Sequence, residues 1–112
     1  MRAVKNVKAD ALRIDTETYN KVFERDSGCV LCKVEPHRKR TQVLECHHFV
    51  SRAKLGMGIE ENLIMLCTPH HQEASFHKEF LKLYLKRHYE NWKEEDLIFS
   101  KDKYYKEGVY WK

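Results

Sequence analysis

The spacing of apolar residues predicts a helix near the start of the chain. Three of them recur at helical spacing: Tyr19, Val22 and Phe23. Gly28 ends this pattern, and Thr16 or Thr18 is suited to cap the first turn, so we expect a helix from about Thr16 to Gly28. The residues before it, 1–15, show no clear period and are expected to form an irregular N-terminal arm.

Two short apolar runs, residues 43–47 and 62–66, have the length and composition of β-strands. The 14 residues between them, 48–61, include Gly56 and Gly58. In a small domain, a connection of this length is more often functional than idle. The chain therefore predicts a strand, a long loop and a second strand.

A second helical pattern follows Pro69. One face of it carries Phe76, Phe80 and either Leu83 or Tyr84, and we expect that face to pack on the core. The final segment, residues 91–112, is rich in aromatic side chains, which are expected to pack back on the domain or on an oligomer partner. Without a repeat or a linker, the pattern indicates a single α+β domain over residues 16–90, followed by this extension.

Composition restricts the class of protein. The chain is 42% hydrophobic and 34% charged, which is typical of a globular domain and not of a disordered chain. No apolar run approaches the roughly 20 residues that cross a bilayer, and no apolar stretch near the N-terminus precedes a cleavage site. We therefore expect a cytoplasmic protein without membrane contact. The 21 basic and 17 acidic side chains give a net charge of +4, which mildly favours a polyanionic partner.

Four residues are spaced as ligands of a zinc ion. Cys29 and Cys32 form a C-x-x-C pair. Cys67 and His70 form a C-x-x-H pair after 34 intervening residues. Each short turn places two ligands on one side of an ion, and two turns complete a tetrahedral shell, so the expected zinc is structural. Cys46 has no partner at this spacing and is expected to be a packed free thiol.

A second set of polar residues lies among these pairs. It comprises the double histidine of ECHHF (45–49), the asparagine of EENLIMLC (60–67) and the second histidine of CTPHHQ (67–72). This ordered set resembles the HNH nuclease family, and the match runs over residues 18–84. The resemblance implies a small ββα-metal (HNH) domain with a structural zinc and flanking helices. It also implies hydrolysis of DNA phosphodiester bonds with a single divalent ion.

The resemblance implies a role for each residue of this set. His47 and His71 match the ligands of a catalytic Mg2+ or Mn2+, and His48 matches the general base. Asn62 matches a residue that orients the base or binds the metal. Adjacent strand residues face opposite sides of a sheet, so both histidines reach one site only where the strand ends. A backbone carbonyl near Asn62 is the expected acceptor that sets the His48 tautomer.

Two points of the match stay open. Many family members carry a further histidine where this chain has Ser75, and His77 is the nearest one here, so the third protein ligand is undefined. The second zinc pair ends in His70 where a cysteine is commoner. This leaves an alternative in which His70 and His71 exchange roles.

Basic residues near these motifs are suited to phosphate contacts. They are Arg38, Lys39, Arg40, Arg52 and Lys54. A solvated loop explains residues 38–40 equally well. The predicted function is a metal-dependent DNA endonuclease, similar to the small stand-alone proteins of phages and bacteria, acting as a homodimer or within a larger nucleic-acid machine. The alternative is a non-catalytic zinc-knuckle domain that binds DNA or serves as an adaptor, and RNA is a further candidate substrate.

Overall fold

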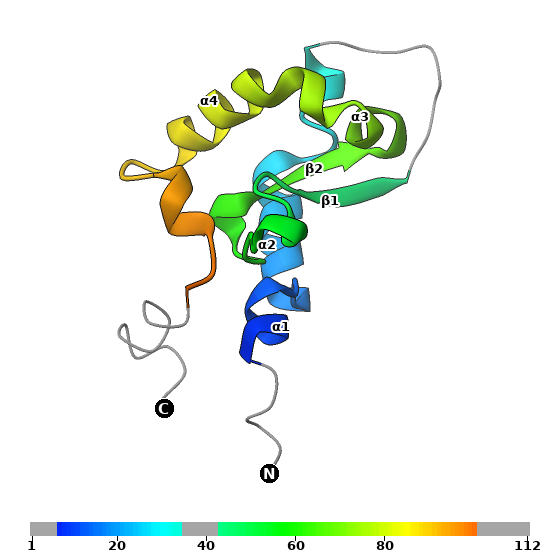
Figure 1. Ribbon diagram of the computed structural model, residues 1–112. Coiled ribbons are helices and arrows are strands. Elements are labelled where there is room, and N and C mark those ends of the chain that lie inside the picture. Colours follow the sequence, from blue (N-terminus) through cyan, green and yellow to red (C-terminus); the bar gives the residue numbers. More distant parts are fainter. Residues whose placement is uncertain (1–6, 35–42, 101–112) are drawn as a thin grey trace.

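A computed structural model of the chain describes residues 7–34 and 43–100. Helices α1 (Val7–Leu12) and α2 (Thr16–Asp26) precede an antiparallel hairpin of β1 (Leu44–His48) and β2 (Leu63–Cys67), and helices α3 (Thr68–Gln72) and α4 (Lys78–His88) follow it (Figure 1). Short 3-10 turns lie between them: η1 (Leu31–Lys33), η2 (Arg52–Lys54), η3 (Glu60–Asn62), η4 (Ala74–His77) and η5 (Glu94–Leu97). The predicted α+β class is confirmed. Over the described ranges, we find no helix with the length and apolar character that a bilayer requires.

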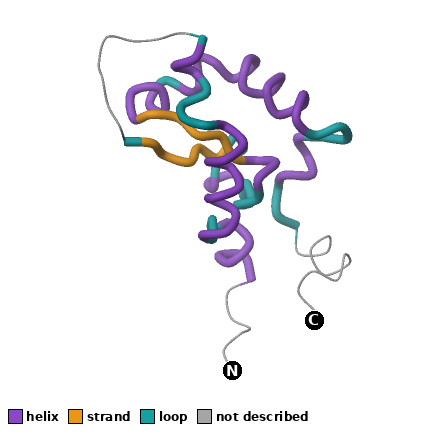
Figure 2. The backbone as a smooth tube through the Cα atoms, turned by 180° about the vertical axis from the view of Figure 1, so that it is seen from behind, coloured by secondary structure: helices purple, strands orange, loops and turns teal. Residues whose placement is uncertain are grey.

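The hairpin divides the core into two clusters, because alternate residues of each strand face opposite sides. Its register runs from Leu44 opposite Cys67 to His48 opposite Leu63. One cluster comprises Val22 of α2 with Leu63 and Met65 of β2. The larger cluster includes Ile64 and Leu66 of β2 with Leu81 and Leu85 of α4. Helix α2 therefore covers one side of the hairpin, where Figure 2 shows it crossing the strands. Each strand begins one residue later than predicted.

The predicted first helix is confirmed, but its cap is a different residue. Asp15, and not Thr16 or Thr18, is the N-cap, and its carboxylate accepts a hydrogen bond from the Thr18 backbone nitrogen at 2.8 Å. This bond satisfies one of the amides that a helix start leaves unpaired. Ser27 (φ 55°) and Gly28 (φ 116°) then turn the chain away in the left-handed region.

The expectation of an irregular N-terminal arm is wrong for Val7–Leu12, which form α1. Ala11 and Leu12 are 8% and 7% exposed, so the end of this helix is part of the packed structure. Its short length and weak apolar period explain why the sequence pattern did not reveal it, since tertiary packing stabilises so short a helix.

The face of α4 that packs on the core is also not the predicted one. Leu81 and Leu85 are fully buried and Tyr84 is half-buried. The predicted residues Phe76, Phe80 and Leu83 are 82%, 38% and 55% exposed. Phe76 lies in η4, which ends before α4 begins at Lys78, whereas Phe80 and Leu83 lie on a different face of α4 from Leu81 and Leu85. The helical period of α4 therefore does not extend back to Phe76.

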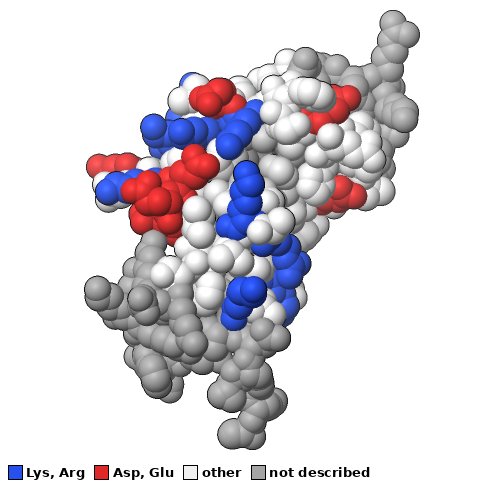
Figure 3. Space-filling view, viewed as in Figure 1, with Lys and Arg blue, Asp and Glu red and all other residues white. Residues whose placement is uncertain are grey.

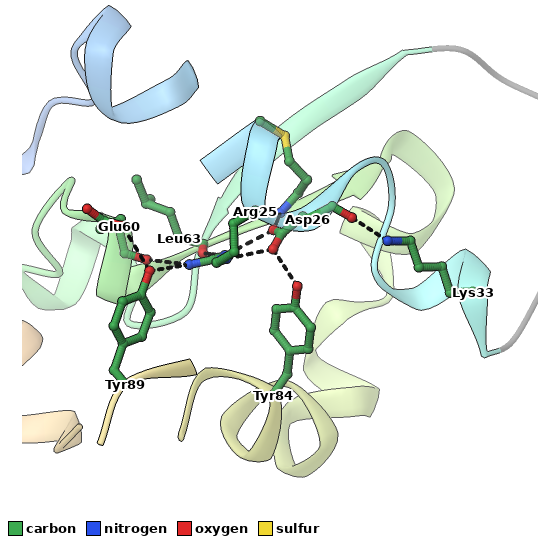
Figure 4. Close-up of polar contacts among 8 residues, drawn as sticks. Arg25, Asp26, Lys33, Glu60, Leu63, Tyr84 and Tyr89 are labelled. Atoms are coloured by element: carbon green, nitrogen blue, oxygen red, sulfur yellow. Dashed lines mark hydrogen bonds and ion pairs between the residues drawn. The ribbon is translucent and has the colours of Figure 1, made fainter. Parts of the chain in front are cut away.

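A buried ion pair joins α2 to the hairpin and to α4 (Figure 4). The fully buried Asp26 carboxylate accepts hydrogen bonds from Arg25 Nε at 2.6 Å, Met65 N at 2.9 Å and Tyr84 Oη at 2.5 Å. Arg25 also donates to Tyr89 Oη at 3.0 Å. A buried carboxylate is tolerated only with such complete pairing, so this network fixes how the three elements meet.

The first part of the C-terminal segment packs on the core, as expected. Trp92 and Leu97 are 8% and 2% exposed and belong to the larger cluster. The Trp92 indole donates to the Glu61 carbonyl at 2.8 Å, and Ile98 forms a β-bridge with Gly56. This segment therefore supports the long loop of the hairpin. The expected packing of aromatic residues beyond Ser100 lies outside the described residues.

Candidate metal centre and histidine cleft

The four predicted zinc ligands lie together beside the end of β2. His70 Nδ1 is 3.5 Å from Cys29 Sγ, 3.4 Å from Cys32 Sγ and 3.5 Å from Cys67 Sγ. Cys32 Sγ and Cys67 Sγ are 3.7 Å apart, and all four ligand atoms lie within 4.8 Å of one another. Tetrahedral zinc, with bonds of about 2.3 Å to sulfur and about 2.05 Å to nitrogen, requires S···N distances of about 3.5 Å and S···S distances of about 3.8 Å. The group could therefore hold a metal ion such as zinc.

The charge state of the cluster also favours a cation. Burial, together with the neighbouring thiols of Cys29 and Cys67, raises the pKa of Cys32 to about 12. Three thiolates at these distances repel one another, and a divalent cation removes that penalty by stabilising the ionised form. The turn that carries the first two ligands is held to β2 by a hydrogen bond from Val30 N to Met65 O at 3.0 Å.

The two adjacent histidines of α3 have separate positions. His70 is 3% exposed and faces the three thiols. His71 faces β1 and meets Glu45. His77 packs against the His70 ring, with centroids 6.3 Å apart. This geometry assigns His70 to the metal cluster and separates His71 from it.

His71 meets Glu45 and His47 on one face of the hairpin. Glu45 and His47 are two residues apart on β1, so their side chains share a face. His71 Nδ1 and Glu45 Oε1 are 2.6 Å apart, and the His47 and His71 ring centroids are 5.1 Å apart at 78°. Thr68 Oγ1 holds the second Glu45 oxygen at 3.2 Å. The His71 nitrogen that remains for a metal is therefore Nε2.

The electrostatics suit histidines that bind through neutral nitrogens. Burial, together with the neighbouring His71 and His48, lowers the pKa of His47 to about 4. The hydrogen bond from His71 lowers the pKa of Glu45, which therefore stays ionised near neutral pH. A carboxylate bonded to one imidazole nitrogen fixes the orientation of the ring and leaves the other nitrogen available, so Glu45 holds His71 in a defined orientation.

His48 is the last residue of β1, the place where adjacent strand residues can reach one site. Its Nε2 is 3.1 Å from the carbonyl oxygen of Leu12 at the end of α1. The prediction of an acceptor near Asn62 is therefore wrong, because the ring bonds instead to a carbonyl at the end of α1. Burial, opposed by this hydrogen bond and aided by the charge of Arg52, lowers the pKa of His48. Its imidazole is thus neutral at pH 7.

His47 and His48 line a common cleft of about 210 Å³. Its other polar lining residues are Ser51, Lys54, Ser75, Lys78 and Glu94. Ser75, at the position where the resemblance expects a histidine, therefore faces the same cleft. Histidines from opposite faces of β1 reach one cavity because the strand ends here.

Asn62 holds the loop that follows His48. Its side chain is fully buried, its Oδ1 accepts from Val50 N at 2.7 Å, and its Nδ2 donates to Val50 O at 3.1 Å and Met57 O at 2.8 Å. A Cβ at Gly56 would lie 1.7 Å from Val50 O, so the closed loop requires glycine there. Of the two roles implied for Asn62, this geometry supports orienting the surroundings of His48 over binding a metal.

Two of the predicted phosphate-contact residues lie on η2, and one of them borders the cleft. Arg52 and Lys54 are exposed on η2, and Lys54 lines the cavity. Figure 3 shows Lys and Arg side chains running down the centre of one face, with most acidic side chains to one side. The other three, Arg38, Lys39 and Arg40, lie outside the described residues.

Sequence reasoning missed three contributors to this region. Glu45 could have been found from strand alternation, since it lies two residues before His47. The Leu12 carbonyl and the other partners of the Arg25–Asp26 pair carry no signal in the sequence, because they come from segments far apart in the chain. Cys46 is a half-buried free thiol next to the smaller cluster, as predicted, and burial raises its pKa to about 11.

Comparison of the chain with models of known protein families, with curated proteins and with solved structures finds no match. The structure itself shows a small α+β protein with a Cys3His group that could bind a metal, and a cleft lined by His47 and His48.

Proposed function

We propose that this protein is a metal-dependent endonuclease of the HNH type that hydrolyses DNA phosphodiester bonds. The observation that carries the proposal is the meeting of His47, His48 and His71 beside the Cys3His group, with two of them lining one cleft. Two histidines with only a packing role would not require a third histidine, bound to a carboxylate, on the facing helix. Zinc in the Cys3His group has a structural role, because all four of its positions are occupied by protein ligands.

The residues at the cleft and next to it divide the chemistry between them. His48 accepts the proton of the attacking water, since its imidazole is neutral at pH 7 and is held by a hydrogen bond. His47 and His71 would hold a Mg2+ or Mn2+ ion, and Glu45 orients His71. The bound ion would stabilise charge on the scissile phosphate and the leaving oxygen. Lys54 and Lys78 at the cleft attract the phosphate backbone.

The test is cleavage of supercoiled plasmid with Mg2+, Mn2+ or EDTA, with zinc content measured in each sample. The diagnostic variant is His48→Gln, which keeps a donor for the Leu12 carbonyl but has no basic nitrogen. We expect nicking by the wild type with a divalent ion, and a loss of about 100-fold or more in His48→Gln. The matched control is His88→Gln, because His88 is exposed on α4, and it should cleave at the wild-type rate.

Two outcomes would overturn the proposal. An unchanged rate in His48→Gln would remove the general base. Absence of cleavage by zinc-loaded protein that binds DNA would favour the adaptor function. A parallel RNA substrate separates the DNA nuclease from an RNA nuclease, because nothing in the cleft discriminates the 2′-hydroxyl.

A further inference from the structure

The hydrogen bond between His48 and α1 determines which ring nitrogen carries the proton. A carbonyl oxygen has no hydrogen to donate, so it only accepts. At 3.1 Å from Leu12 O, Nε2 of the neutral ring must therefore carry the proton. The lone pair then belongs to Nδ1, and this is the nitrogen that a water molecule would meet as a base.

The end of α1 is held in place by the long loop of the hairpin. Gly58 N donates to Ala11 O at 3.0 Å, directly before the Leu12 carbonyl that His48 uses. A Cβ at Gly58 would lie 2.2 Å from Arg13 O, so the two segments touch along their backbones. The loop that begins after His48 therefore returns to secure the acceptor of its ring.

We propose that the C-terminal end of α1 is a positioning element for His48: the Leu12 carbonyl, next to the Ala11 carbonyl that Gly58 N binds, selects the tautomer with an unprotonated Nδ1. The consequence for catalysis rests on the nuclease function proposed above, whereas the tautomer itself does not. A segment outside the strand, loop, strand and helix unit thus completes the site. Gly58 is the position at which an added side chain can alter this contact. A backbone carbonyl itself cannot be substituted directly.

The first experiment is 15N NMR of the histidine rings in the full-length, zinc-loaded protein at pH 8, with His48→Gln used to assign the His48 signals. We expect a protonated Nε2 and an unprotonated Nδ1 for His48 in the wild type. A protonated Nδ1 overturns the proposal, whether or not the protein cleaves DNA. This NMR measurement does not depend on whether a Gly58 variant folds.

The second experiment compares Gly58→Ala with Asp10→Ala, a substitution at an exposed position of α1. The added methyl group forces α1 and the loop apart, so Gly58→Ala should lose the single tautomer and slow plasmid nicking about 10- to 100-fold with zinc retained. Asp10→Ala should change neither reading. A wild-type tautomer and rate in folded Gly58→Ala would show that α1 does not position the ring. A lost tautomer with an unchanged rate would refute the catalytic consequence alone.

Discussion

Glu45 is the residue whose contribution depends most directly on a single contact. Its carboxylate meets His71 Nδ1 at 2.6 Å and leaves Nε2 of that ring directed away from the acid. Carboxylate partners of this kind fix the tautomer and orientation of metal-binding histidines and raise their basicity. At this scale, a side chain two residues before a predicted ligand acts on a histidine 26 residues further along the chain.

Replacement of Glu45 by glutamine should lower the affinity of the site for the divalent ion that cleavage requires. The amide is neutral and a poorer acceptor, so the divalent-ion concentration for half-maximal nicking should rise about 10- to 100-fold. A titration of plasmid nicking with Mn2+ measures it, with Glu79→Gln on the exposed side of α4 as the control. Equal titration curves for Glu45→Gln and wild type would rule out the positioning of His71 by Glu45.

The proposed nuclease mechanism predicts that the pH dependence of nicking follows from the pKa of His48. The base must be unprotonated, and burial lowers its pKa below 6.5. The rate should therefore decline only as the pH falls through this lowered pKa, and at pH 6.5 it should exceed half of its plateau value. Initial rates between pH 5 and pH 8 at saturating divalent ion measure the profile. A half-maximal rate at pH 7 or above would contradict His48 as the base.

At the scale of elements, the buried Arg25–Asp26 pair decides how α2, β2 and α4 meet. Helical spacing predicted α2 correctly, but it placed the wrong face of the later helix on the core. Leu81 and Leu85 are buried, whereas Phe76 in η4 and Phe80 in α4 are exposed. Periodicity reports which residues share a face, whereas packing against β2 decides which face is buried.

Removal of one hydroxyl from this network should be measurable. Tyr84→Phe deletes the donor to the fully buried Asp26 carboxylate, so we expect a loss of about 1.5–3 kcal/mol in the free energy of unfolding. The matched control is Tyr19→Phe, at a position that is 36% exposed, where the change should stay within about 0.5 kcal/mol. Urea denaturation of the two variants gives the comparison. Equal midpoints would show that Arg25 and Met65 alone satisfy the carboxylate.

At the scale of the whole molecule, the Cys3His group ties the turn around η1 to β2 and α3. A chain of 112 residues buries a limited core, and metal binding adds directly to its folding free energy. The C-x-x-C and C-x-x-H pairs were enough to predict this group, because ligand spacing within a turn is local. The spacing did not determine that the two pairs lie a few ångströms apart, because the tertiary fold brings them together.

Loss of one zinc ligand should therefore unfold the protein, and loss of the fourth cysteine should not. Cys32→Ser is expected to purify without stoichiometric zinc and to lack a cooperative thermal transition, as should wild type stripped by a chelator. Cys46→Ser should keep one zinc per chain, since Cys46 lies apart from the group. Zinc analysis and circular dichroism melting measure both. A zinc-free Cys32→Ser protein with the wild-type melting temperature would show that the metal group does not support the fold.

The sequence by itself determined the helix at α2, the two strands within one residue, and the four members of the metal group, because each depends on local spacing. It also singled out His47, His48, Asn62 and His71. Only the tertiary structure decided that His70 and not His71 joins the thiols, that Asn62 fastens a loop, and that the Leu12 carbonyl meets His48. These outcomes depend on contacts of side chains and backbone carbonyls between segments distant in the chain. The local spacing of residues does not determine such contacts.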